Sequence, residues 1–465
     1  MGVNFSSFEI GRRALRAGQL GLAVTGQNIA NVNTPGYTRQ RVQLSPTPAD
    51  GANLNLTGNG VSIDGVQAFR DRFIESRVLS ETAISGRLTA RRDALASVDA
   101  VFNDSNSAGG VQSALNGFFN SFRELEAHPE SLQARGAVVA KGAELGSAFA
   151  ATRARLVDIR RETDGQVRAT VDEINSLSRK VAELNAQVQV AEHSGANASE
   201  LRDVRAETVK RLTELSGARA VEDRSGAVTL TLADGKPLVV GNQATPLEVF
   251  SAPPDGLATV QIDGQPAALG DGQLKGLFEA IDEINSHLAS LDALAVTIAD
   301  RVNTLHAGGT DLDGNTGTNF FTIPADGSPV TAATLSVNPA LRANPRLVVA
   351  SPLAASSPQG ATVAGQIASL LNETTSQAGG RTGSFSAIYA SIVADAGAGV
   401  RTAEDALGVQ QSILAQTTAQ RESISGVSLD EEAINLLQYQ KAYEAAARFL
   451  KIADELTQTI LSLGG

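Results

Sequence analysis

The sequence predicts a mostly helical protein with an inserted β-rich region, an α+β fold of elongated shape. Apolar residues repeat every seven positions at both ends of the chain, which is typical of helices that pack along their length. Residues 218–345 instead carry short alternating runs and turn dipeptides, which favour strands. Aromatic residues make up only 4% of the 465 residues. This content suits long helices with small interfaces better than one large aromatic core.

The first predicted helix covers residues 5–33. Its large apolar heptad positions are Phe8, Leu15, Leu22 and Ile29. The positions three residues after the first three of these are Gly11, Gly18 and Thr25. This second row is small enough to let another helix approach closely. Because each glycine costs a helix about 1 kcal/mol relative to alanine, we expect this helix to depend on packing against a partner.

The stretch NIANVNTPGYTRQRV, residues 28–42, predicts a sharp end to this helix. Pro35 disfavours the helical region for Thr34, and Pro-Gly at the two central positions is typical of a type II turn. Beyond the turn, Val42 and Leu44 alternate with polar residues, which predicts an extended segment with one face in water.

Further helices are predicted over residues 67–102 and 111–160, separated by a polar loop at 103–110, and over residues 164–192. The last of these carries a heptad whose main positions are Val167, Ile174, Val181 and Val188. This pattern fits an antiparallel coiled-coil-like helix and an ordinary amphipathic bundle helix equally well.

The character of the sequence changes at about residue 218. Alternation at 227–232, then Asp234-Gly235 and the apolar run 237–240, indicate a β-hairpin. We predict a small β-containing domain at 218–345, interrupted by a helix at about 276–306. Helices are predicted again at 361–377 and 398–424, before Ser425-Gly426 breaks the chain.

A last helix is predicted at 429–462. One heptad row consists of Leu429, Leu436, Tyr443 and Leu450, and the row three positions along consists of Tyr439, Ala446, Ala453 and Ile460. The simplest arrangement pairs the two ends of the chain as an antiparallel coiled-coil-like unit, with the middle looped outward. The predicted divisions are the N-terminal core helix and turn, the first part of a helical rod domain, the β-containing insertion, the returning part of the rod and the C-terminal core helix, at 1–45, 46–217, 218–345, 346–424 and 425–465.

Composition excludes several classes of function. With 38 Lys+Arg against 50 Asp+Glu, the net charge of −12 argues against nucleic acid and anionic membrane partners, which need concentrated basic surface. The absence of cysteine excludes disulfides, thiolate metal sites and cysteine nucleophiles. Apolar runs are too short for a cleaved secretory signal or a membrane span, so we expect neither signal cleavage nor membrane insertion.

Candidate chemical sites in the sequence each have a simpler explanation. Residues 311–317 imitate the start of a calcium loop, but Thr316 stands where glycine is needed and Thr322 where glutamate belongs. The four histidines are scattered, outside metal-ligand spacing. The acidic run 430–432 follows Ser428 and complements the dipole at the start of the last helix. We therefore predict no catalytic residues, no metal and no cofactor.

The turn stretch resembles a signature of bacterial flagellar axial proteins, the rod, hook and hook-associated families. The matching turn positions are Asn31, Thr34, Pro35, Gly36 and Tyr37. Residues 425–461 are similar to the C-terminal segment of the hook-associated protein 1 family, which forms the hook–filament junction. Residues 38–42 and 305–321 are also similar to that family, and a hook protein is not expected to carry the latter segment.

The resemblance implies a structural, non-enzymatic subunit that forms a ring of copies of itself between hook and filament. It implies hook protein and the second junction protein as neighbours, the flagellar type III export apparatus and an export chaperone at the C-terminal helix as partners, and an extracellular location in the flagellum. We predict an assembly interface made by Phe8, Leu15, Leu22, Ile29, Leu429, Leu436, Tyr443, Leu450 and Ile460. The alternatives are a hook or rod subunit and, further away, an enzyme with a catalytic domain at 218–345.

Overall fold

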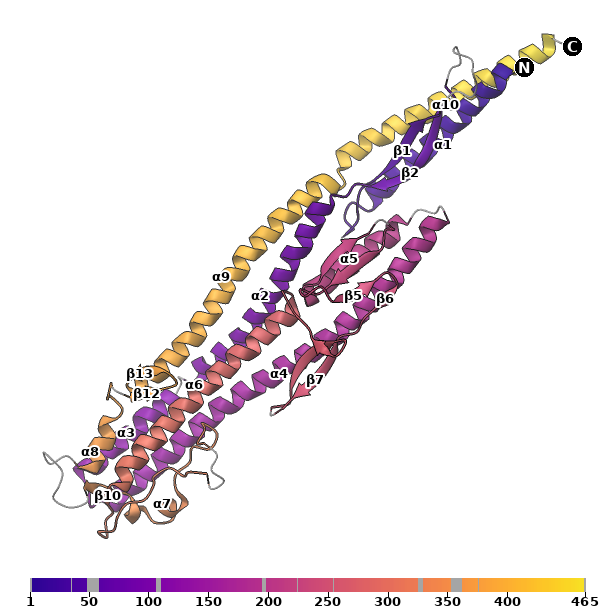
Figure 1. The fold of residues 1–465 in the computed structure, drawn as a ribbon. Helices are drawn as coiled ribbons and strands as arrows, with labels where there is room; N and C mark the ends of the chain where they lie inside the picture. The colour runs from indigo at the N-terminus through magenta and orange to yellow at the C-terminus, as the bar shows by residue number, and fades with distance from the viewer. Residues whose placement is uncertain are drawn as a thin grey trace.

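The computed structural model describes residues 2–463 apart from residues 35, 48–57, 106–109, 195–197, 224, 254, 325–328, 353–361 and 375. The axes of the long helices lie roughly along one line and give an elongated molecule, with the two ends of the chain together at one tip (Figure 1). The predicted α+β class, mostly helical with inserted strands, is confirmed.

The tip consists of α1 (Gly2–Ala30) and α10 (Leu429–Leu463), which lie side by side (Figure 1). The pair is antiparallel, because Gly11 lies against Leu450 while Asn28 contacts Glu432. A hairpin of β1 (Gln40–Pro46) and β2 (Val61–Ala68) packs on α1. The extended segment predicted after the turn is therefore β1. Its partner β2 was not foreseen, and the helix predicted from residue 67 begins later, at residue 72.

The rod below the tip is a bundle of long helices in which α2 packs against both α6 and α9, and α3 packs against α4. These helices are α2 (Arg72–Ser105), α3 (Val111–Ala127), α4 (Leu132–His193), α6 (Gln273–Ala307) and α9 (Phe385–Ser425). The predicted helix at 111–160 is divided at 128–131, where the Ser131 hydroxyl caps α4 by accepting from the Ala134 N–H at 3.1 Å. The predicted gap after residue 160 does not exist, because residues 161–163 continue α4, a helix of 62 residues.

The far end of the rod holds an aromatic core that the low aromatic content did not lead us to expect. Phe118 lies at its centre, with ring centroids 5.1 to 5.5 Å from those of Phe119, Phe122, Phe320 and Phe321. All five rings are fully buried. A small number of phenylalanines thus forms one core, because the chain gathers them from α3 and from the segment after α6.

The inserted strands form two small antiparallel sheets. Their members are β3 (Arg219–Glu222), β4 (Val228–Thr231), β5 (Pro237–Val240) and β6 (Gln243–Ala244) in one, and β7 (Glu248–Ala252), β8 (Leu257–Ile262) and β9 (Gln265–Pro266) in the other. The predicted hairpin is confirmed, with Leu230 opposite Val239 and Gly235 at a φ of +84° in its turn. The sheets share a core with α4, α6 and α5 (Ser199–Ser216). Helix α5 was not resolved as a separate element by the sequence pattern.

The chain between α6 and α9 forms short elements around the aromatic core. They are β10 (Gly309–Thr310), α7 (Pro339–Ala343), the 3-10 helix η1 (Pro345–Leu347), β11 (Ser351–Pro352), α8 (Val363–Ser369), β12 (Ser376–Ala378) and β13 (Arg381–Gly383). The helix predicted at 361–377 is thus short, and α9 begins well before residue 398. It begins there because the Ser384 hydroxyl accepts from the Ala387 N–H at 3.2 Å and caps the first turn.

Candidate assembly site at the paired terminal helices

The glycines on one face of α1, Gly11 and Gly18 of the small row and the neighbouring Gly21, receive the side chains of α10. A Cβ atom at Gly21 would lie 2.4 Å from Tyr439 Cδ1, and one at Gly11 would lie 2.6 Å from Leu450 Cγ. Such distances are far below ordinary van der Waals contact. The two helix axes are therefore as close as they are because α1 has glycine at these positions.

The predicted assembly residues occupy two kinds of place. Leu15, Leu22, Ile29, Leu436 and Leu450 are half-buried within the single chain. Leu450 and Tyr443 lie against Gly11 and Gly18 of the same chain's α1. By contrast, the exposed members are Phe8, Leu429 and Tyr443, each with at least two fifths of its surface in water. Ile460 belongs to α10, but its side chain lies outside the described residues.

The heptad pattern did not predict a second apolar row on α10. We call it the outward row, and it consists of Ile434, Leu437, Ile452 and Leu456. These side chains are 56% to 65% exposed, and their spacing places them on the side of the helix away from the row that meets α1. The signal was present in the sequence, because α10 is apolar on two opposite faces where a surface helix normally has one.

The turn after α1 has the predicted geometry. Gly36 adopts a φ of +81°, a conformation that favours glycine, and the Tyr37 N–H donates to the Thr34 carbonyl at 3.2 Å. The Thr34 hydroxyl donates to Asn31 Oδ1 at 3.1 Å. Pro35, also part of the predicted motif, lies outside the described residues.

A buried polar network joins this turn to the start of α10. Asn28 donates to the Gln40 carbonyl at 2.9 Å and to Glu432 Oε2 at 3.0 Å, and its own Oδ1 accepts from the Tyr37 hydroxyl at 2.8 Å. Burial, followed by the nearby carboxylates Asp203, Glu432 and Glu200, raises the pKa of Tyr37 to about 12. The phenol therefore keeps its proton, and remains a donor, at neutral pH.

Glu432 does more than complement the helix dipole, the role that the sequence suggested. Its side chain is almost fully buried and accepts from Arg39 Nε at 2.8 Å, while Arg39 Nη1 donates to Glu431 at 2.6 Å. The Arg39 N–H also donates to the Ser425 carbonyl at 3.0 Å, just before α10. A buried carboxylate needs such partners. We call Asn28, Tyr37, Arg39 and Glu432 the polar latch.

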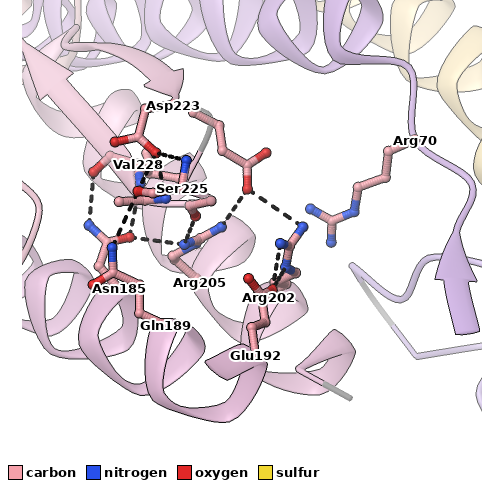
Figure 2. Close-up of polar contacts among 12 residues, drawn as sticks. Arg70, Asn185, Gln189, Glu192, Arg202, Arg205, Asp223, Ser225 and Val228 are labelled. Atoms are coloured by element: carbon pink, nitrogen blue, oxygen red, sulfur yellow. Dashed lines mark hydrogen bonds and ion pairs between the residues drawn. The ribbon is translucent and has the colours of Figure 1, made fainter. Parts of the chain in front are cut away.

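The tip is tied to the rod through α5. Arg70 forms an ion pair with Asp203, and Gln27 of α1 donates to Glu200 at 3.1 Å. Burial raises the pKa of Asp203, while the Arg70 charge opposes that rise. Figure 2 shows Arg70 reaching toward Arg202 and Arg205 of α5. Gln27 near the end of α1 and Arg70 just after β2 thus both connect the tip to α5.

Behind Arg70, the side chain of Arg205 is held in a fixed position. It donates to Asn185 Oδ1 at 3.0 Å, to the Gly226 carbonyl at 2.7 Å and to Glu222 Oε1 at 2.9 Å (Figure 2). Asn185 in turn donates to the Val228 carbonyl at 2.9 Å (Figure 2). These contacts fasten α5 to α4 and to the first sheet, and they make α5 a rigid support for the tip.

The calcium-like loop uses its oxygen atoms within the protein. Asp311 Oδ1 accepts from the Asp313 and Asn315 N–H groups, both at 2.8 Å, and Asp313 pairs with Arg346. Among the described residues, no group of three or more His, Asp or Glu side chains is arranged to hold a metal. Within the same described part of the chain, no helix is long and apolar enough to cross a membrane.

Comparisons with known proteins identify the family. Residues 95–321 match the family model described as the flagellar hook-associated protein FlgK helical domain. Residues 8–38 match the flagella basal body rod protein family, and residues 419–463 match the C-terminal family of flagellar basal body rod FlgEFG proteins. The terminal matches are thus to motifs shared among axial proteins, while the central match names the hook-associated group.

Relatives along nearly the whole chain agree. Flagellar hook-associated protein 1 of Bacillus subtilis is 28% identical, with 98% of each chain covered, and its counterpart in Escherichia coli is 26% identical, with 97% of this chain and 98% of the relative covered. The solved structure of the flagellar hook junction protein FlgK from Burkholderia pseudomallei matches with a TM-score of 0.63 at 16% identity, covering 75% of this chain and 100% of that one. That structural likeness shows a shared fold. The chain belongs to the flagellar hook-associated protein 1 family of structural flagellar proteins.

Proposed function

We propose that this protein assembles with copies of itself as a ring at the hook–filament junction, through the outward row of α10 and the exposed residues Phe8, Leu429 and Tyr443. The outward row is the observation that carries the proposal. Large apolar side chains that lie together in water mark a surface that another protein covers. Each side chain that becomes fully buried on assembly contributes about 1.5 to 3 kcal/mol.

The contact of Leu436, Tyr443 and Leu450 with α1, which we call the seam, has a different role in this proposal. Leu436, Tyr443 and Leu450 hold α10 against α1 within one copy, and Tyr443 also reaches the surface. The paired helices then act as one unit that presents the outward row to its neighbours. The domain divisions at 45, 217, 345 and 424 remain part of the proposal, with the tip as the assembly unit and the rod and its sheets facing outward.

The partners follow from the family. We propose hook protein and a second junction protein as the axial neighbours, an extracellular position in the flagellum and export through the type III apparatus. An export chaperone on α10 fits the outward row, because an exposed apolar row must be covered before assembly to prevent aggregation. A non-catalytic role fits the way in which the acidic loop and the buried arginines are occupied by partners within the chain.

The hook or rod alternative is less well supported. Hook and rod proteins share the terminal motifs, which the matches at 8–38 and 419–463 reflect. The match at 95–321 is to the hook-associated helical domain, and it covers the end of α2, the helices α3 to α6 and the inserted sheets. This central region therefore favours the junction.

The test compares a double substitution on α10 with a single control substitution on α9. Ile434→Asp with Ile452→Asp places charges in the outward row, where we expect unchanged melting of the purified protein, normal export and no incorporation into flagella. Val409→Asp, at a 63% exposed position on α9, serves as the control and should incorporate normally. Normal motility and incorporation of the outward-row variant would contradict the proposal.

A further inference from the structure

A groove with a volume of about 610 Å³ lies between the start of α2, helix α5 and strand β3. Its lining includes Gly36 of the turn and Arg421 near the end of α9. It therefore lies at the level of the α9–α10 junction along the length of the molecule. Figure 2 shows the α5 side of this region, with Arg202 and Arg205 opposite Arg70.

Apolar side chains stand open on both sides of the groove. Phe73 of α2 is 89% exposed and Val221 of β3 is 64% exposed, although the floor between them includes the buried Val78 and Val209. Strand β3 is at one edge of its four-stranded sheet. An aromatic residue left this open beside an apolar floor indicates a contact that a single chain does not complete.

The charges around the groove fall into two groups. One group forms ion pairs within the chain: Arg70 with Asp203, Arg202 with Glu192 and Arg205 with Glu222. The other three basic side chains in the lining are Arg72, Lys210 and Arg421. Within the described parts of the chain, their shortest ion pair is the 3.9 Å contact of Arg72 with Glu222. The groove therefore offers cations to an incoming acidic segment, with Glu75 and Glu207 as opposing charges in its lining.

We propose that this groove receives the α9–α10 junction, residues 422–431, of the neighbouring copy in the ring. The proposal rests on the proposed function, in which copies are related by rotation about the flagellar axis. Such a rotation keeps each segment at its level along the axis, so the junction of one copy lies level with the groove of the next. The contact is heterologous, the kind that closes into rings.

The chemistry of residues 422–431 complements the groove. Ile424 and Leu429 are both exposed apolar residues that can cover Phe73 and Val221. The segment contains the acids Glu422, Asp430 and Glu431 and has no lysine or arginine. Leu429 also begins the helix that bears the outward row, so the groove contact would continue the proposed assembly surface without a gap.

Cysteine cross-linking tests the contact directly, because the chain has no cysteine of its own. One variant carries Phe73→Cys with Leu429→Cys, and a second carries Val221→Cys with Ile424→Cys. A control carries Leu132→Cys with Leu429→Cys. Residue 132 begins α4, a helix about 90 Å long, at the end far from the groove. Flagella isolated from cells that make only one variant are oxidised and run on a denaturing gel without reductant.

We expect a ladder of dimers and larger multimers from the first two variants and a monomer from the control. If both variants give monomers, or a disulfide within one chain, while the protein is present in the flagella, the groove contact is refuted and the ring proposal stands. Absence of the exported control protein from the flagella would instead refute the proposed function, and the groove contact with it.

Charge reversal gives an independent readout. Arg72→Glu with Lys210→Glu in the groove, or Glu422→Arg with Asp430→Arg in the segment, should each lower the yield of the Val221–Ile424 cross-link at least about tenfold, without changing the melting of the purified protein. Combining the two reversals should restore most of the yield. A combined variant no better than either alone would refute the charge complementarity on which the groove contact depends.

Discussion

Replacing Gly21 by alanine should weaken the pairing of α1 with α10. The new Cβ would meet Tyr439 Cδ1 at 2.4 Å and Cγ at 2.7 Å, so the whole ring must move by about 1 Å to reach ordinary contact. Overpacking of this kind costs about 1 to 3 kcal/mol. The gain in helix propensity returns about 1 kcal/mol. We expect a net loss of about 1 kcal/mol in the stability of the helix pair.

Gly26 provides the matched control on the same helix. A Cβ there would meet nothing within 4 Å, so Gly26→Ala should gain about 1 kcal/mol from propensity alone. Hydrogen exchange of the α1 amides measures both, because local opening sets their exchange rates. We expect exchange about fivefold faster for Gly21→Ala and about fivefold slower for Gly26→Ala. Slower exchange in both variants would show that the glycine row does not set the distance between the helices.

Three further predictions concern the rod, the polar latch and the seam. Burial lowers the pKa of His306 to about 4, and the unfolded chain therefore binds more protons between pH 6.5 and 4. Stability should fall by about 2 to 3 kcal/mol over that window, measured by urea unfolding, and His306→Gln should lose this pH dependence. Glu432→Ala removes one of the acceptors of Arg39 and one of those of Asn28 and should cost about 2 kcal/mol, seen as faster exchange in β1 and early α10. Adding Arg39→Ala should cost little more, since both changes break one network, and full additivity would contradict the latch. Leu436→Asp with Leu450→Asp should separate α10 from α1 in the purified monomer, so protease should remove α10 faster than in the outward-row variant; equal rates would place the seam elsewhere.

The terminal helices could be predicted from the sequence because their interface is periodic. The heptads in α1 and α10 each predict which face of the helix is covered. Glycine in one row predicts how closely the partner helix approaches. The same reasoning did not predict that the outward row is exposed. A row of Ile434, Leu437, Ile452 and Leu456 has helical spacing too, but only the packed structure shows which of two apolar faces the chain itself covers.

The polar latch could not be predicted in the same way. Asn28 and Glu432 are 404 residues apart, and no periodicity links single polar residues over such a distance. Each also has a sufficient local explanation, Asn28 as a residue near a helix end and Glu432 as an acid in a first helical turn. The aromatic core was not predicted for a related reason. Composition gives the number of phenylalanines but does not show that α3 and residues 320–321 bring them together.

The chemistry of the seam suggests why the tip has both a latch and an uncovered apolar row. Glycine at positions 11, 18 and 21 allows close approach but contributes little apolar area of its own. A pair held by such a seam needs another source of register, and a buried carboxylate with Asn28 and Arg39 as donors supplies it, because any slip would leave charge unpaired. In the proposed assembly, the exposed apolar side chains of the outward row are then free to contact neighbouring copies. In that proposed assembly, stability within the subunit and affinity between subunits depend on different faces of α10, which is why substitutions on the two faces should separate folding from assembly.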